Sequence, residues 1–211
     1  MGPDGSRRAP RRREETRARI VAAAERVMRG KGISHATTRE IAQTAGVAEG
    51  SIYNHFRSKA DLFYAVLGQL PPDFFALTTG LPARAGTGDV RETLEEVVRA
   101  AVIFYGHSVP IGISVAGDPP LLARLREEVR RPGAGPQMPF ELLGDYLRAE
   151  QELGRLSDAV SPRAAADLLM GTCFQKAYLA HFYDEAIPEA EVAAFARRAV
   201  NALLHGLAPP N

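Results

Sequence analysis

Apolar residues recur at helical spacing in the first regular segment of the chain. From Glu14 onward, Ile20, Ala24, Val27 and Met28 fall at positions i, i+4, i+7 and i+8 of one pattern. This spacing puts the four side chains on one face of an amphipathic helix. Glycines at positions 30 and 32 end the pattern, as expected at a helix C-terminus. The pattern therefore predicts a helix from Glu14 to about residue 30.

Two short helices follow, and a tight turn joins them. Thr37 and Glu40 have the spacing of a capping box, in which each side chain binds the backbone amide of the other residue. Gly46 is expected to end this helix, because glycine readily takes the positive φ of a helix C-terminus. The next helix is expected over residues 49–56. Two helices in this arrangement form a helix-turn-helix.

The rest of the chain also has helical patterns. Only residues 107–117 are ambiguous, because apolar residues alternate there as in a strand. No second strand is available to pair with this segment, so we expect irregular helix. Residues 80–88 and 132–139, rich in glycine and proline, are expected to be loops. The other expected helices cover residues 58–70, 73–79, 89–106, 119–131, 140–153, 162–183 and 188–207. The predicted fold class is all-α.

These elements divide the chain into three parts. Residues 1–13 contain glycine, proline, serine and arginine without apolar periodicity, which predicts a disordered basic arm. Residues 14–60 form the expected helix-turn-helix domain, and residues 61–211 form a larger helical domain. With 211 residues, 45% of them hydrophobic, the chain is long enough to bury a core without disulfides.

Charge is distributed unevenly between these parts. The formal net charge is only +1, but residues 1–65 hold 13 Lys and Arg against 7 Asp and Glu. Residues 66–211 hold 13 Lys and Arg against 18 Asp and Glu. A basic N-terminal part on an acidic body indicates that the N-terminal part meets a polyanion. The alternative is a solvated basic tail without a partner.

The outward face of the second short helix carries groups suited to nucleic acid. Ile52 and Phe56, four residues apart, are expected to pack inward. An ordinary solvent-exposed helix would carry mostly Lys, Glu and Ala on the other face, whereas hydroxyl and amide groups bind base edges and phosphates. The outward positions, which we take as candidate DNA contacts, are Glu49, Gly50, Ser51, Tyr53, Asn54 and His55.

Further candidate phosphate contacts lie outside this helix. Lys59 follows the capping residue Ser58 at a helix N-terminus, where a positive charge opposes the helix dipole, so a phosphate partner explains it better than helix stabilisation does. Thr38 lies beside the amides of a helix start, which bind anions. Arg17 projects from the first helix, where a solvated position is nearly as compatible. His55 is equally compatible with a backbone contact to DNA and with a structural hydrogen bond.

One continuous run of residues 38–63 has a recognisable order, TREIAQTAGVAEGSIYNHFRSKADLF. In order and spacing it resembles the signature of the tetracycline-repressor (TetR) family, and the resemblance extends over residues 17–67. The chain differs at Ala48, where the family commonly has a Ser or Thr that caps the recognition helix. Alanine caps poorly, and Glu49 near the helix start is expected to compensate through the helix dipole.

The resemblance implies a function and a set of partners. Members of the family are homodimers whose variable C-terminal domain binds a small-molecule effector. The chain is therefore expected to be a ligand-responsive transcriptional repressor that leaves a palindromic double-stranded DNA operator when a partly apolar effector binds. The alternative class is a helical enzyme or a small-molecule-binding protein without a role on DNA.

Two sets of residues in the C-terminal part are candidates for these roles. The helices expected over residues 162–183 and 188–207 have apolar faces that suit a four-helix dimer interface, although the same faces also suit the core of one subunit. The candidate interface residues are Leu168, Gly171, Phe174, Tyr178, Ala199 and Leu203. The candidate pocket residues, each also compatible with plain core, are Phe74, Phe75, Phe104, Tyr105, His107, Met138, Phe140 and Phe174.

Other functional classes find little support in the sequence. No nucleophile elbow, zinc-protease motif, phosphate loop or dinucleotide fingerprint is present, so we expect no enzyme, no cofactor and no metal site. The pair His181 and Glu185 is more typical of an exposed helix contact than of a metal site. Cys173 is the single cysteine and is expected to be a buried hydrophobic residue in a reduced, cytoplasmic protein. No run approaches about 20 consecutive apolar residues, so we expect no membrane span.

Overall fold

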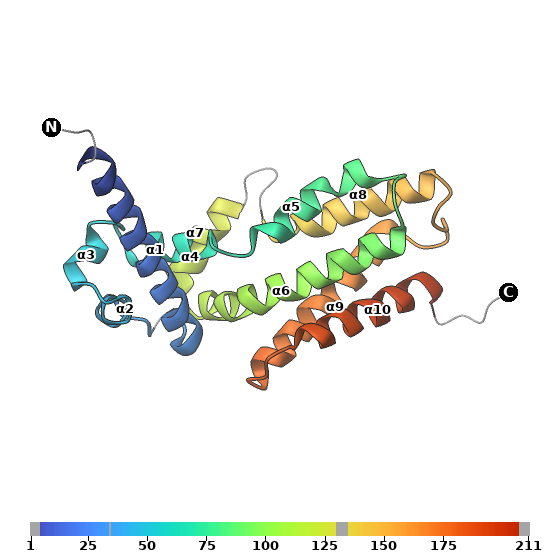
Figure 1. Cartoon of the computed structure of the whole chain (residues 1–211). Helices are drawn as coiled ribbons and strands as arrows, with labels where there is room; N and C mark the ends of the chain where they lie inside the picture. The colour runs from blue at the N-terminus through green and yellow to red at the C-terminus, as the bar shows by residue number, and fades with distance from the viewer. Residues whose placement is uncertain (1–4, 34, 130–134, 207–211) are drawn as a thin grey trace. The chain divides into compact units, whose positions relative to one another are not determined.

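The computed structural model describes residues 5–33, 35–129 and 135–206, and in this part of the chain it is all-α, as predicted. Figure 1 traces the helices in chain order. Their bounds are α1 Gly5–Lys31, α2 Thr38–Ala45, α3 Glu49–Tyr53, α4 Lys59–Leu67, α5 Pro72–Gly80, the 3-10 helix η1 Leu81–Arg84, α6 Val90–Ala116, α7 Pro119–Val129, α8 Met138–Glu152, α9 Pro162–Phe182 and α10 Glu189–His205.

The first helix begins earlier than predicted. Residues 5–13, expected to belong to a disordered arm, form the first turns of α1, and residues 1–4 lie outside the described part. Arginine is a good helix former, and the Arg11 guanidinium lies 3.0 Å from the Glu15 carboxylate one turn later. The hydroxyl of Thr16 donates to the carbonyl of Arg12 at 2.9 Å. These local contacts extend a helix that apolar periodicity alone did not reveal.

Helix α6 is longer and more regular than predicted. It continues through residues 107–116, with Pro110 inside the helix. Ile111 and Val115 lie one turn apart and are buried, whereas Ile113 on the opposite side is exposed. Alternating apolar residues therefore fit a helix with one buried face as well as a strand. The loop expected over residues 80–88 also contains a short helix, η1.

By length and mean hydropathy, α6 is the one helix in the described residues that would suit a membrane span. About 44% of the 18-residue apolar window of this helix is buried inside the protein. Leu94, Val97 and Val98 near its start are fully buried. This burial is typical of a core helix in a globular fold.

The described residues group into two compact units. The first contains residues up to Leu70 together with Pro110–Arg124, so it holds α1 to α4, the end of α6 and the start of α7. Its core includes the fully buried Ile20, Ile41 and Phe63. The boundary predicted at residue 60 lies inside this unit, because α4 packs on α1 through its apolar face.

The second unit contains Pro71–Val109 and the residues from Leu125 onward, with α8 packed along α9. Its core includes Tyr146, Leu143 and Met170, all fully buried.

Hydrogen bonds to a buried carboxylate and from its arginine partner fix the loop before α6 in the second unit. The fully buried Glu150 accepts a hydrogen bond from the Gly86 amide at 3.1 Å and lies 3.3 Å from the Arg155 guanidinium. Arg155 in turn donates to the carbonyl of Gly88 at 2.5 Å. A buried carboxylate is tolerated in proteins when it is paired and hydrogen-bonded in this way.

Candidate nucleic-acid interface

The turn between α2 and α3 has the geometry that the sequence predicted. The side chain of Thr37 accepts a hydrogen bond from the Glu40 amide at 3.2 Å and so caps α2. Gly46 has φ +65°, in the left-handed region, and its amide and that of Val47 bond back to carbonyls in the last turn of α2. Only half of the capping box forms, because the Glu40 carboxylate pairs with Lys31 of α1 instead of the Thr37 amide.

Helix α3 is shorter than predicted and spans only five residues, Glu49–Tyr53. Ala48 provides no side-chain cap, in line with its poor capping ability. The amides of His55 and Phe56 both bond to the carbonyl of Ile52, so the chain continues as a turn instead of a helix. Ile52 and Phe56 are buried, which confirms the predicted inward face.

Three of the predicted DNA contacts form one polar cluster at the start of α2 and along α3. The Thr38 hydroxyl donates to Glu49 Oε1 at 2.8 Å and lies 3.3 Å from the Tyr53 hydroxyl. Glu49 and Tyr53 are exposed and Thr38 is half-buried. The Glu49 carboxylate is thus held by a neighbouring helix as well as lying at the start of its own. The cluster presents two hydroxyls and a carboxylate to solvent on the face that the sequence predicted.

The other outward positions differ in exposure. Gly50 and Asn54 are exposed, whereas Ser51 and His55 are half-buried. The His55 ring lies 6.3 Å from the Phe56 ring, measured between centroids. This ring contact leaves both roles of His55 open, a structural one and a contact with DNA.

Arg19 of α1 binds the turn of the helix-turn-helix. Arg19 Nη2 donates to the carbonyls of Ala45 and Gly46, at 2.6 and 3.2 Å. These carbonyls lie at the C-terminal end of α2, where a positive charge also interacts favourably with the helix dipole. This role of Arg19 was not predicted, because nothing in the local sequence pattern links two positions 27 residues apart.

Arg17, predicted to contact phosphate, has a contact within the fold. Its guanidinium lies over the Phe56 ring, 5.3 Å from the centroid. Such a cation–π contact stabilises an exposed site by about 0.5–1 kcal/mol. Arg13, one turn earlier, lies with Nη2 3.5 Å from the carbonyl of Asn54. The basic side of α1 therefore reaches the end of α3.

Lys59, another predicted phosphate contact, begins α4 directly after Ser58, whose hydroxyl caps the helix by accepting the Asp61 amide at 3.1 Å. Lys59 lines a hollow of the first unit together with Ile33, Asp118 and other residues. Burial lowers the pKa of Lys59 below its usual 10.5, and the negative charge of Asp118 opposes this shift. The ammonium group is therefore partly withdrawn from solvent beside a carboxylate.

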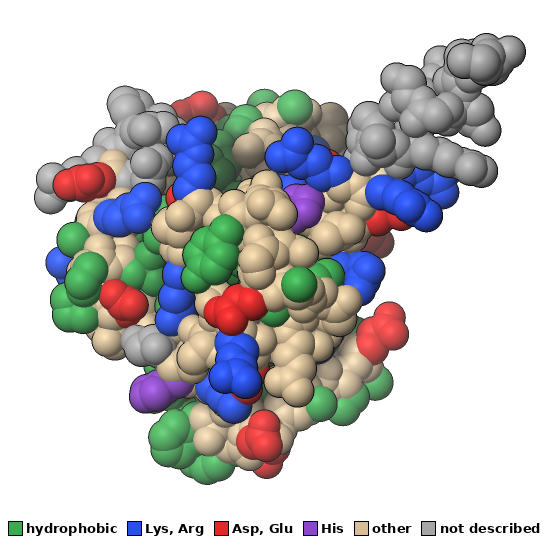
Figure 2. Space-filling view, turned by 90° about the vertical axis from the view of Figure 1, so that its left-hand side faces the viewer, with side chains coloured by type: hydrophobic (Ala, Val, Ile, Leu, Met, Phe, Trp, Pro, Cys, Tyr) green, Lys and Arg blue, Asp and Glu red, His purple; other side chains and the backbone are tan. Residues whose placement is uncertain are grey.

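Figure 2 looks onto the side of the molecule where α1, α2 and α3 lie in Figure 1. Among the side chains that the structure describes on this face, Lys and Arg are scattered between Asp and Glu and do not merge into one basic patch. Phosphate contacts from this face would therefore come from individual cations.

In the second unit, five of the predicted pocket residues touch one another. The Phe74 ring stacks on Phe104 with centroids 4.6 Å apart, Phe75 packs edge-on against Phe104 at 5.1 Å, and Tyr105 packs edge-on against Phe174 at 5.6 Å. Burial raises the pKa of Tyr105 above its usual value. Among the described contacts, none joins the ring of Phe140 to this aromatic cluster. His107, Met138 and Phe140 are half-buried.

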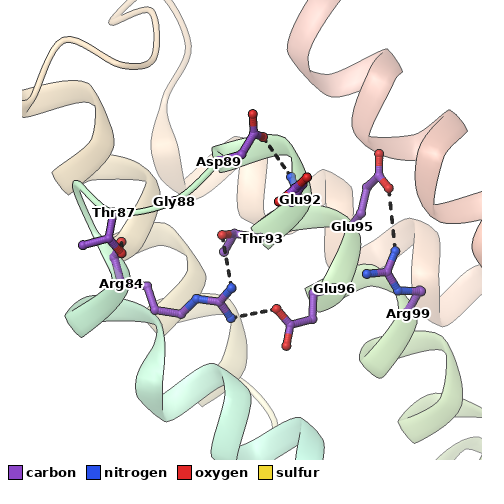
Figure 3. Close-up of a pocket in the computed structure, with 9 residues that line it drawn as sticks. All are labelled: Arg84, Thr87, Gly88, Asp89, Glu92, Thr93, Glu95, Glu96 and Arg99. Atoms are coloured by element: carbon purple, nitrogen blue, oxygen red, sulfur yellow. Dashed lines mark hydrogen bonds and ion pairs between the residues drawn. The ribbon is translucent and has the colours of Figure 1, made fainter.

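A separate hollow of about 450 Å³ in this unit has a different chemistry. Figure 3 shows that its charged side chains largely pair with one another. Arg84 lies 2.8 Å from Glu96 and donates to Thr93 at 3.3 Å, and Arg99 lies 3.6 Å from Glu95. This lining does not suit an apolar effector.

The predicted interface residues on α9 are exposed within the single chain. Leu168 is 68% exposed, Phe174 46% and Tyr178 38%, and Gly171 is exposed between them. Ala199 and Leu203 of α10 are half-buried. Cys173 points the other way and is fully buried, with its Sγ 3.1 Å from the Leu169 carbonyl. Burial raises the pKa of the Cys173 thiol to about 12.

Residues 20–66, which include α2, α3 and most of α4, match the family model of bacterial regulatory proteins of the tetR family. The HTH-type transcriptional regulator TtgR of Pseudomonas putida is 45% identical over 64 residues, which cover 30% of each chain. The HTH-type transcriptional regulator AcrR of Shigella flexneri is 33% identical over 104 residues, 46% of each chain. The matches thus span about a third to a half of these relatives, which are named as regulators and not as enzymes.

The fold comparison covers more of the chain. A TetR-family transcriptional regulator from Mesorhizobium loti superposes with a TM-score of 0.66 over 92% of this chain and 97% of the other, at 22% identity. At this identity the likeness concerns the fold, an N-terminal helix-turn-helix followed by a helical C-terminal part. The chain therefore carries, in residues 20–66, the signature of bacterial regulatory proteins of the tetR family, and its fold is similar to that of a TetR-family transcriptional regulator.

Proposed function

We propose that the protein is a transcriptional regulator that inserts α3 into the major groove of double-stranded DNA. The observation that carries this proposal is the cluster of Thr38, Glu49 and Tyr53, hydrogen-bonded on an outward face above a buried anchor of Ile52 and Phe56. Base edges are read by hydrogen bonds, and phosphates are bound by hydroxyls and cations. A stable surface helix without a partner has no need of such a cluster.

The phosphate contacts that we propose come from the edges of this face. More than half of the surface of Tyr53 is exposed, so its hydroxyl can bind a phosphate oxygen. The backbone amides near Thr38 suit phosphate oxygens as well. Gly50, Ser51, Asn54 and His55 complete the face toward the duplex, and Lys59 and Arg17 flank it. Since Arg17 and Lys59 also have contacts within the fold, their share in DNA affinity is expected to be smaller than their charge alone suggests.

We propose further that the protein is a homodimer joined through α9 and α10. The apolar side chains of Leu168, Phe174 and Tyr178 lie at helical spacing on one exposed face of α9. Exposed apolar faces of this kind mark interaction sites. A two-fold dimer asks for a palindromic operator, with two recognition helices about 34–36 Å apart.

The proposed dimer acts as a repressor that a small, partly apolar effector releases from DNA in the cytoplasm. The aromatic cluster around Phe104 and Tyr105 supports a partly apolar effector, because aromatic side chains gather there; since these rings pack on one another, the effector would bind by displacing some of them. By thermodynamic linkage, operator DNA must weaken effector binding by the same factor by which effector weakens operator binding.

The experiment that tests this proposal starts from the DNA of the native host. Fragments captured on the purified protein are sequenced, and one enriched fragment is labelled for a fluorescence anisotropy titration at several salt concentrations. We expect enrichment of palindromic fragments and an affinity that falls steeply as salt rises. If no fragment is enriched above a bead-only control, the protein does not regulate transcription through this face.

A further inference from the structure

We propose that Glu49 reads a cytosine and thereby sets the base preference of the protein at one position of each operator half-site. This inference rests on the proposed DNA-binding function and adds to it a specificity-determining residue. It follows from the place of Glu49 on α3, from its contact with Thr38 and from the chemistry of the base edges.

The place of Glu49 suits base contact. In a helix-turn-helix, the N-terminal residues of the second helix are the ones that meet base edges. Glu49 is the first residue of α3 and is exposed. The next residue, Gly50, is also exposed and has open space where a Cβ would stand. A duplex can therefore approach the backbone at this end of α3 closely.

The carboxylate of Glu49 is oriented before DNA binds. The Thr38 hydroxyl holds Oε1 at 2.8 Å from the neighbouring helix. Within the residues that the structure describes, no Lys or Arg forms an ion pair with this carboxylate and no hydrogen bond reaches its Oε2. One oxygen thus fixes the group and the other remains for a partner. Beside the phosphates of DNA, an unpaired carboxylate is unfavourable unless a donor binds it.

The donors available in the major groove select the base. Guanine presents two acceptors there and thymine presents one, so both repel a carboxylate. Adenine presents a donor at N6 beside an acceptor at N7, so one of its two groups repels the carboxylate. Cytosine presents the N4 amino donor alone, and it is the usual partner of Glu and Asp. The expected order of preference is therefore cytosine, then adenine, then guanine and thymine.

A purely structural role for Glu49 makes a different prediction. As a negative charge in the first turn of α3, or as a link to Thr38, it would stabilise the helix-turn-helix without regard to sequence. Removing the charge would then weaken binding to all DNA sequences by one common factor. Base preference therefore separates the two roles.

The test compares three proteins in a selection from a randomised DNA library: the wild type, Glu49→Gln and the control Glu40→Gln. Glu40 undergoes the same chemical change on the neighbouring helix but is paired with Lys31. Glutamine binds adenine through N6 and N7, so Glu49→Gln should replace cytosine by adenine at one position of each half-site, with a change in relative affinity of about ten-fold. Glu40→Gln should keep the wild-type motif.

The outcomes separate this inference from the function on which it rests. If the wild type enriches no motif, the proposed function fails. If the wild type enriches a motif that Glu49→Gln enriches unchanged, or if folded Glu49→Gln binds all sequences equally poorly, the role of Glu49 in base reading is refuted. Circular dichroism of each variant checks folding. Should Glu49→Gln not fold, Glu49→Ala serves instead, and it should lose the preference at that one position while keeping the rest of the motif.

Discussion

The left-handed turn at Gly46 allows one substitution to be compared at two sites with opposite expected effects. Gly46 has φ +65°, a region that costs a residue with a Cβ about 1–2 kcal/mol. The new Cβ would also lie 3.2 Å from Nη2 of Arg19. Because that nitrogen is the far end of a flexible side chain, it can move slightly, at the expense of its hydrogen bonds to Ala45 and Gly46.

Gly46→Ala should therefore lower the free energy of unfolding of the first unit by about 1–2 kcal/mol. Gly30 near the end of α1 is the matched control, since it is helical and has open space where a Cβ would stand. Gly30→Ala should raise stability by up to about 1 kcal/mol, because alanine favours the helix.

Urea denaturation followed by far-ultraviolet circular dichroism measures both changes. Hydrogen exchange of the amides in α2 and α3 locates the loss in Gly46→Ala. Opposite signs for the two variants are the expected result. A Gly46→Ala protein as stable as the wild type, or a change of the same sign in both variants, would refute the account of this turn.

Further predictions concern a lysine, the dimer and the thiol. Lys59→Met should raise the Tm at neutral pH, because burial lowers the pKa of Lys59 and so makes the charged lysine unfavourable in the folded protein. This gain in Tm should vanish as the pH rises past the usual lysine pKa of 10.5, where the lysine is neutral in both states. If the ammonium group contacts phosphate, the same substitution should also reduce the slope of DNA affinity against salt concentration by about one unit. Leu168→Arg should give a folded monomer in light scattering, whereas the control Leu153→Arg, at a site 57% exposed outside α9, should stay dimeric. If both variants remain dimeric, the interface lies elsewhere. Cys173 should react with a thiol reagent at neutral pH only after denaturation, since its pKa is about 12 and it is buried; rapid labelling of the native protein would contradict this.

Sequence periodicity predicted the fold where a helix has one apolar face and a local stop. The caps at Thr37 and Ser58 and the turn at Gly46 depend on residues a few positions apart, so the sequence reveals them. Periodicity did not reveal the helical start of α1, because the contacts there are polar. It also did not reveal that α6 continues as a regular helix past Pro110, because the other turns of the helix tolerate this proline. The first error arises where helix formation does not depend on an apolar stripe, and the second where Ile113 between the buried Ile111 and Val115 makes a helical face look like a strand.

The candidate site was predictable in its members and less so in its contacts. The outward face of α3 follows from helical spacing, so Glu49 and Tyr53 could be named from the sequence alone. Their link through Thr38 joins residues 11 and 15 positions apart, and the contacts of Arg19 span more than 25 positions. Such distances depend on how α1, α2 and α3 pack, which no local pattern encodes.

The shortness of α3 has a consequence for how the protein can evolve. A five-residue helix is far too short to be stable by itself, so α3 owes its shape to the buried side chains of Ile52 and Phe56 and to the turn that Arg19 holds. The outward residues contribute little to that shape. Mutations at outward positions such as Gly50 and Asn54 can therefore change the preferred DNA sequence at little expense in folding, and descendants of one ancestral scaffold can diverge toward different operators without passing through unfolded intermediates.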